Sequence, residues 1–62
     1  MDDVMVSLED SSKREDRAVK LYEKAAGEAT EPRVREVFLA IAKVEKDHLA
    51  LDNIMMAKYK NK

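Results

Sequence analysis

The sequence predicts an all-α protein: an antiparallel hairpin of two helices, two copies of which form a four-helix bundle. Three observations predict this fold. The strongest breakers of regular structure, Gly27 and Pro32, lie five residues apart near the middle of the chain. The flanking segments are rich in good helix formers and lack the alternation of a strand. A chain of 62 residues without cysteine buries too little surface to be stable alone, so we expect it to associate.

The first helix is expected over residues 5–27. A stripe with alternating spacings of four and three residues runs along one side of this helix. The stripe is interrupted by one charged residue, Glu15, and the helix is expected to close at Gly27 or a neighbour. The members of this stripe are Val4, Leu8, Ser11, Glu15, Ala18, Tyr22, Ala25 and Ala29.

The turn is expected at residues 28–31 and the second helix over 32–58, which makes residues 1–62 a single domain. Thr30 or Glu31 is positioned to cap this helix, and Pro32 falls in its first turn. Its stripe contains three polar residues, and flanking apolar positions widen both stripes to the width that a bundle helix needs. This stripe is Val34, Phe38, Ile41, Glu45, His48, Asp52, Met55 and Tyr59, and the flanking positions are Val19, Ala26, Val37, Val44, Leu51 and Ile54.

Folding the chain about residue 30 brings two glutamates to the same height. Glu15 and Glu45 each lie 15 residues from that point, roughly 22 Å along the hairpin at 1.5 Å per residue. His48 lies one turn beyond Glu45, on the same side of the helix. The same geometry places Ser11 or Ser12 level with His48.

These three side chains predict a metal site. A carboxylate that faces a bundle core must be paired, hydrogen-bonded or bound to a metal. A divalent cation between Glu15 and Glu45, with His48 as a further ligand, satisfies this requirement. An ion pair of Glu15 with Lys43 or Lys46 is the alternative. Three ligands are few for two hard metal ions, but a second hairpin doubles them to four glutamates and two histidines, the ligand set of ferritin-like bundles.

At residues 15–26, 32–38 and 45–48 the chain resembles half of a rubrerythrin-type ferritin-like domain, and the resemblance covers about residues 8–56. It implies that Glu15, Glu45 and His48 are iron ligands and that Tyr22 packs near the site. The chain is also similar to the encapsulated ferritins, which usually carry a tryptophan where Leu21 stands. No cysteine is present for a rubredoxin centre, and Ala18 replaces an additional carboxylate of rubrerythrins, so the resemblance implies no built-in electron relay.

The expected function is that of a di-iron carboxylate protein with two iron ions per dimer, although manganese or zinc also suits these ligands. It would act as a ferroxidase or as an oxidoreductase that reduces O2 or peroxide, in iron handling or protection from oxidative stress. Tyr22 would have a supporting or redox role, and Asp52, Ser11 and Ser12 would surround the ligands. The expected partners are a second copy or a higher even number of copies, a separate electron donor, or an encapsulating shell. The alternative is a metal-free helical module for dimerisation or scaffolding.

Charge and hydropathy argue against two other classes of partner. The 12 basic and 13 acidic residues nearly balance, which is not typical of a protein that binds nucleic acid. The longest apolar run, residues 37–42, is far shorter than the about 20 residues that span a membrane. The start of the chain is acidic, unlike a secretory signal, so the expected location is the cytoplasm.

Overall fold

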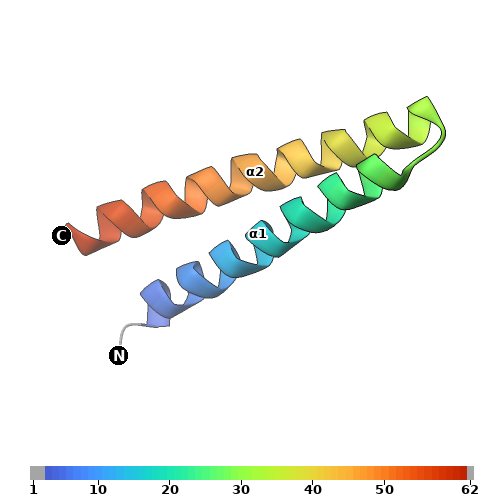
Figure 1. Cartoon of the computed structure of the whole chain (residues 1–62). Coiled ribbons are helices and arrows are strands. Elements are labelled where there is room, and N and C mark those ends of the chain that lie inside the picture. Colours follow the sequence, from blue (N-terminus) through green and yellow to red (C-terminus); the bar gives the residue numbers. More distant parts are fainter. Residues whose placement is uncertain (1–2, 62) are drawn as a thin grey trace.

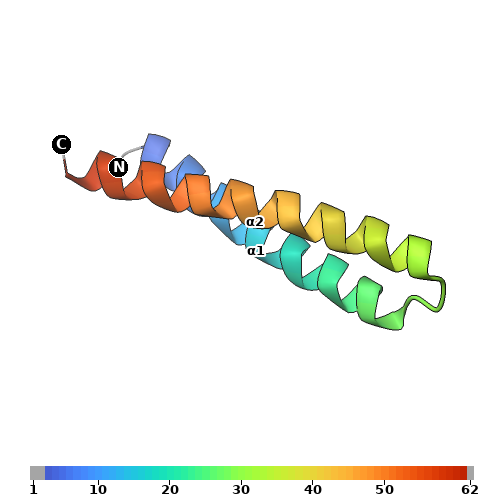
Figure 2. The same ribbon diagram turned by 90° about the horizontal axis from the view of Figure 1, so that it is seen from above.

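The structure is a computed structural model that describes residues 3–61; residues 1, 2 and 62 lie outside the described part. It consists of two long helices, α1 (Asp3–Glu28) and α2 (Pro32–Lys60). Figures 1 and 2 show them running side by side in opposite directions, with both chain ends at the same end of the molecule. The predicted all-α hairpin is therefore confirmed. Each helix extends two residues further than predicted at the open end, because no breaker follows there.

The turn depends on backbone hydrogen bonds and on one arginine. At the end of α1 the N–H of Ala29 donates to the carbonyl oxygens of Ala25 and Ala26, at 3.0 and 3.3 Å. Arg35 reaches back from α2, and its Nη2 donates to the carbonyl oxygen of Ala29 at 2.8 Å. This contact satisfies a carbonyl that the end of a helix would otherwise leave without a partner.

The structure decides two sequence expectations about the turn. The helix α1 closes at Glu28, a neighbour of Gly27, as predicted, and no glycine or other residue in the described part has a positive φ. Glu31 occupies the position before α2 with an extended backbone, but its side chain makes no capping hydrogen bond. Pro32 in the first turn therefore starts α2, since its fixed φ suits that position.

The contact between the helices is narrow and made largely of small side chains. Val19, Ala26 and Ala42 form the buried core. Closer to the turn, the rings of Tyr22 and Phe38 stack with their centroids 6.2 Å apart. Four members of the predicted stripes, Val4, Val34, His48 and Met55, are exposed in the single hairpin. The contact between α1 and α2 covers neighbouring positions instead. These neighbours include Leu49 and Met56, which are half-buried.

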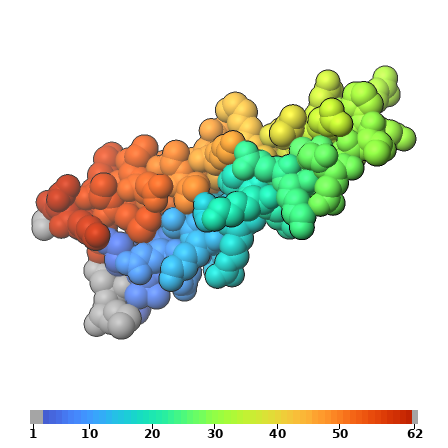
Figure 3. Space-filling model, viewed as in Figure 1, coloured from blue at the N-terminus to red at the C-terminus, as the bar shows by residue number. Residues whose placement is uncertain are grey.

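The molecule is a thin rod, as the space-filling view in Figure 3 shows. Its Cα atoms span 47 × 16 × 10 Å, and the radius of gyration is 14.4 Å. A compact chain of this length would have a radius of gyration of about 11 Å. Many large apolar side chains remain exposed as a result: Val4, Leu21, Val34, Val37, Leu39, Val44, Leu51, Ile54 and Met55.

Neither described helix combines the length and the apolar character that crossing a membrane requires.

Candidate metal centre

Glu15, Glu45 and His48 come together halfway along the rod. Glu15 lies at the middle of α1, and Glu45 lies at the middle of α2 with His48 one turn further on. One ligand atom from each residue can be chosen so that all lie within 4.8 Å of one another. The structure thus contains the cluster that the equal distances from the turn predict. In a hairpin of two straight helices, residues equally far from the turn lie at the same height, and they meet when both belong to the inward-facing stripes.

Glu15 is more enclosed than His48. Its side chain retains 21% of its exposure, whereas that of His48 retains 56%. The Oε2 atom of Glu15 is buried and has no hydrogen-bond partner in the described part of the chain. Nδ1 of His48 lies 3.6 Å from this oxygen, which is longer than a hydrogen bond. A buried carboxylate oxygen in this state has the lone pairs that a bound cation would use.

The electrostatics of the cluster also favour a positive charge. The hydrogen bond with the side chain of Glu15 raises the pKa of Glu45 above its ordinary value, and burial and the charge of Glu15 act in the same direction. His48 partly opposes this by lowering the Glu45 pKa. Two carboxyl groups that share a hydrogen bond need a proton between them unless a cation takes its place. The cluster is therefore arranged to hold either a proton or a metal ion.

The two sides of the cluster differ in polarity. Toward the turn lie the buried side chains of Val19 and Ala42, followed by the aromatic pair Tyr22 and Phe38. Tyr22 is two helical turns from Glu15 and belongs to this apolar layer rather than to the cluster of ligands.

Toward the open end of the hairpin lies a hydrogen bond that the sequence did not specify. The hydroxyl of Ser11 donates to Oδ2 of Asp52 at 2.7 Å, and the pair is partly buried between the helices. Asp52 was expected beside His48, but its contact across the hairpin is with Ser11. Ser12 is half-buried next to it. Ser11 lies four residues before Glu15, on the same side of α1, and this spacing in the sequence indicates that the polar layer continues beyond Glu15 toward the open end.

The lysines do not pair with Glu15. Lys46 forms an ion pair of 2.8 Å with Glu23 across the two helices, and Lys43 forms one of 3.3 Å with Asp47 along α2. The alternative of a Glu15–lysine ion pair is therefore wrong. The sequence gave no reason to select Glu23 as the partner of Lys46. Glu23 lies much nearer the turn than Lys46, so the two residues are not at the same height, and both side chains lie outside the contact between the helices.

The site is open on one side. His48 is exposed, and the described part of the chain encloses no pocket. Two carboxylates and one imidazole are hard or borderline ligands that suit iron, manganese or zinc. Three such residues are too few to complete the coordination of two ions.

Comparison with known proteins agrees with this geometry. The family model described as Rubrerythrin matches residues 7–62. No curated protein and no solved structure gives a significant match. The matched region includes both helices from the first turns of α1 onward, together with all three residues of the cluster.

Proposed function

This chain belongs to the rubrerythrin family, and from that premise we propose that it is a di-iron carboxylate protein whose metal site is shared by two copies of the hairpin. Family membership implies a ferritin-like di-iron protein. The observation that carries the proposal for this chain is the cluster of Glu15, Glu45 and His48, in which a buried carboxylate oxygen has no partner.

The residues of the cluster fit the metals in number and in kind. Ferritin-like sites take a glutamate from each of two helices and a Glu-x-x-His motif from each of two others. One hairpin supplies Glu15 on α1 and the Glu45–His48 motif on α2, which is half of that set. The cluster lies halfway along both helices, so a second hairpin packed over its full length brings its own cluster to the same height. Four carboxylates would then balance the charge of two divalent ions.

An uncovered apolar stripe on α2 supports the second copy. Positions 34, 37, 41, 44, 48, 51 and 55 repeat with spacings of three and four residues, and Val37, Val44 and Leu51 among them are exposed. His48 belongs to this same stripe, so the partner that covers it would also close the open side of the cluster. We define the uncovered stripe as Val34, Val37, Ile41, Val44, His48, Leu51 and Met55.

The exposed area is also of the right size for one partner. The accessible surface of the hairpin is 4919 Å². A compact monomer of the same mass would expose about 4,100 Å². The excess of about 800 Å² equals what one protein contributes to an interface of standard size.

The proposed activity is that of a ferroxidase or of an oxidoreductase that reduces O2 or peroxide. Iron ions bound here would supply the redox chemistry. The carboxylates of Glu15 and Glu45 would hold and neutralise them, and His48 would add a nitrogen ligand on each chain. Val19, Tyr22 and Phe38 exclude water on one side of the cluster, while Ser11 and Asp52 keep the other side polar. These 62 residues contain no cysteine, so they do not themselves hold the ligands of a rubredoxin centre.

Anaerobic titration of the metal-free protein with ferrous iron tests this proposal. We expect one iron per chain by elemental analysis and a dimer, or a larger even assembly, by light scattering. Glu45→Ala should remove the bound metal and leave a helical protein, while Glu36→Ala, an exposed glutamate on the same helix, should bind iron normally. A wild-type dimer that binds no iron would favour the metal-free scaffold, and unchanged iron in Glu45→Ala would refute the assigned ligands.

A further inference from the structure

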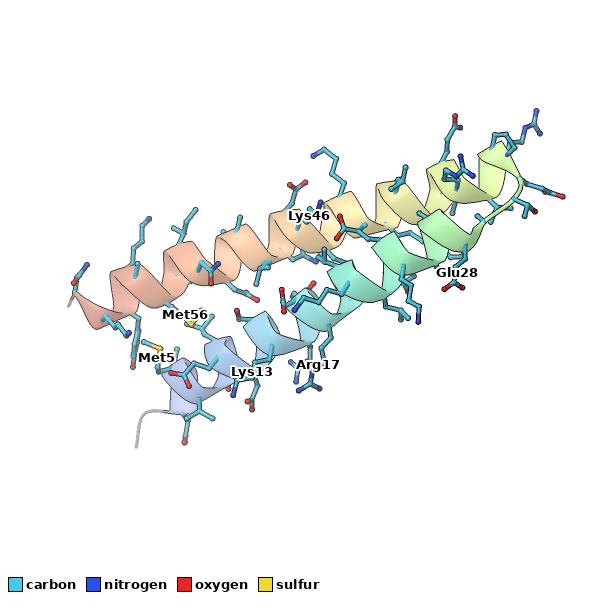
Figure 4. The ribbon with its side chains drawn as sticks, in the orientation of Figure 1. Met5, Lys13, Arg17, Glu28, Lys46 and Met56 are labelled. Carbon is cyan, nitrogen blue, oxygen red and sulfur yellow. The ribbon has the colours of Figure 1, made fainter. Side chains whose placement is uncertain are left out.

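A row of basic side chains runs along the outer side of α1. Lys13, Arg17, Lys20 and Lys24 are separated by four, three and four residues, which places them on one side of the helix. All four are exposed. Figure 4 shows Lys13 and Arg17 projecting from the side of α1 that is turned away from α2. We call these four residues the basic row; neither the metal cluster nor the contact between the helices uses it.

The basic row carries more repulsion than a solvated helix surface needs. Arg17 has Lys13 four residues before it, Arg14 three before it and Lys20 three after it, and it has no acidic residue at these distances. Like charges at such spacings destabilise a helix. A surface that only needs to be soluble would alternate the signs of its charges.

Two acidic groups on α1 close to the row are already engaged. Asp16 pairs with Lys20 at 3.0 Å, and Glu23 pairs with Lys46 of α2 at 2.8 Å. Among the four cations of the row, only Lys20 has an ion pair within the described residues, although Glu9, Asp10 and Glu28 lie three or four residues from Lys13 or Lys24. Arg17, which has no acidic residue at these spacings, is the charge most clearly left for a partner.

An exposed leucine lies beside the row. Leu21 retains 62% of its exposure, the highest value among the large apolar residues that remain exposed in the described part. It follows Arg17 by four residues and precedes Lys24 by three, so both cations are its neighbours on the helix surface. Leu21 therefore offers one apolar contact next to the cations of the row.

Two other kinds of partner fit this surface less well. Single-stranded nucleic acid would need exposed aromatic rings for its bases, but Tyr22 and Phe38 stack on each other between the helices. A membrane surface would need a continuous apolar side next to the cations, and Leu21 is one isolated residue. We propose that the basic row and Leu21 form a docking surface for an acidic protein segment, with carboxylates facing the cations and one apolar residue against Leu21.

This surface stays available in the proposed dimer. The second copy would cover the uncovered stripe of α2, whereas the basic row lies on α1 on the side away from α2. The docking surface does not depend on the metal, so it can be tested on the metal-free chain.

Fluorescence anisotropy of a labelled oligoglutamate peptide with one central leucine measures the docking. The test variant carries Lys13→Gln, Arg17→Gln and Lys24→Gln. Its control carries Arg33→Gln, Lys58→Gln and Lys60→Gln, which remove the same charge elsewhere on the chain. We expect the test variant to bind at least about tenfold more weakly than wild type and the control to change by less than about threefold. We also expect wild-type binding to weaken as salt is added.

Leu21→Ser separates the apolar contact from the charges, because it should weaken the peptide with leucine and leave an all-glutamate peptide unchanged. Helical circular dichroism checks that each variant folds. Equal losses in the two triple variants, or no binding of the peptide to wild type, would overturn the proposal. So would a single-stranded oligonucleotide of equal charge that binds as tightly through the same cations. None of these results would affect the di-iron proposal, which the iron titration decides.

Discussion

The carboxyl groups of Glu15 and Glu45 lie close together across the two helices, and the interaction with Glu15 raises the pKa of Glu45. One glutamate comes from the middle of α1 and the other from the middle of α2. Like charges this close oppose folding unless a proton or a cation lies between them. The stability of the metal-free hairpin and its affinity for metal are therefore linked through this one contact.

Glu45→Gln should stabilise the metal-free protein at neutral pH. Because folding raises the pKa of Glu45, the folded state holds this proton more tightly than the unfolded chain. That stabilisation is complete below the ordinary carboxyl pKa of 4.5 and is lost as the pH rises through the raised pKa. An amide cannot ionise, so the advantage of Glu45→Gln should grow over this window. Urea unfolding at equal chain concentration and several pH values measures it, with Glu36→Gln as the control; a constant difference at all pH values would contradict the linkage.

Glu15→Leu should separate intrinsic stability from metal binding. The variant removes a buried oxygen without a partner, so the metal-free protein should become more stable. Wild type should gain about 2.7 kcal/mol from metal supplied at about 100 times its Kd, and the variant should gain almost nothing. Thermal unfolding with and without ferrous iron under anaerobic conditions measures both effects. Equal metal-dependent stabilisation of the two proteins would exclude Glu15 as a ligand.

Leu51→Glu should prevent association of the hairpins. Leu51 is exposed in the uncovered stripe of α2, and a second copy would bury its side chain. Leu39→Glu is the matched control, because Leu39 is also exposed on α2 but lies outside this stripe. Light scattering should report a dimer or larger even assembly for wild type and for Leu39→Glu, and a monomer for Leu51→Glu. Dissociation by Leu39→Glu alone would place the interface on another side of α2.

The Ser11–Asp52 hydrogen bond should show measurable coupling. It is partly buried and joins the two helices at 2.7 Å, whereas the Lys43–Asp47 pair is exposed and lies within α2. A double-mutant cycle of Ser11→Ala and Asp52→Ala should give a coupling of about 1 kcal/mol or more, since one partner is charged. The same cycle for Lys43 and Asp47 should give about 0.3–0.5 kcal/mol. Similar coupling energies for both pairs would show that partial burial between the helices does not strengthen the Ser11–Asp52 hydrogen bond.

Gly27→Ala should stabilise the hairpin by about 0.5–1 kcal/mol. Gly27 lies inside α1 without a positive φ, and nothing lies within 4 Å of an added Cβ. The substitution thus reduces the freedom of the unfolded chain and costs no contact in the folded one. Urea unfolding measures the change. A destabilised variant would mean that this position needs the conformational freedom of glycine after all.

Most of the hairpin was predictable because its signals are local. Pro32 and the end of α1 lie where the breakers place them, and both flanking segments have strong helical propensity. The extra residues at the open end, including Asp3 and Lys60, were missed because no breaker in the sequence marks where either helix ends there. The common height of Glu15 and Glu45 was also predictable, since it follows from their equal distances from the turn.

The sequence by itself determined the two helices, the turn, and the height at which Glu15, Glu45 and His48 meet. Only the tertiary structure decided which side of α2 packs against α1. Apolar residues cover a wide arc of α2, so its periodicity permits several rotations about the helix axis. The observed rotation encloses Glu15, directs Asp52 to Ser11, and leaves His48 on the uncovered stripe. Such a rotation depends on the side chains of both helices fitting together, and neither helix specifies it alone.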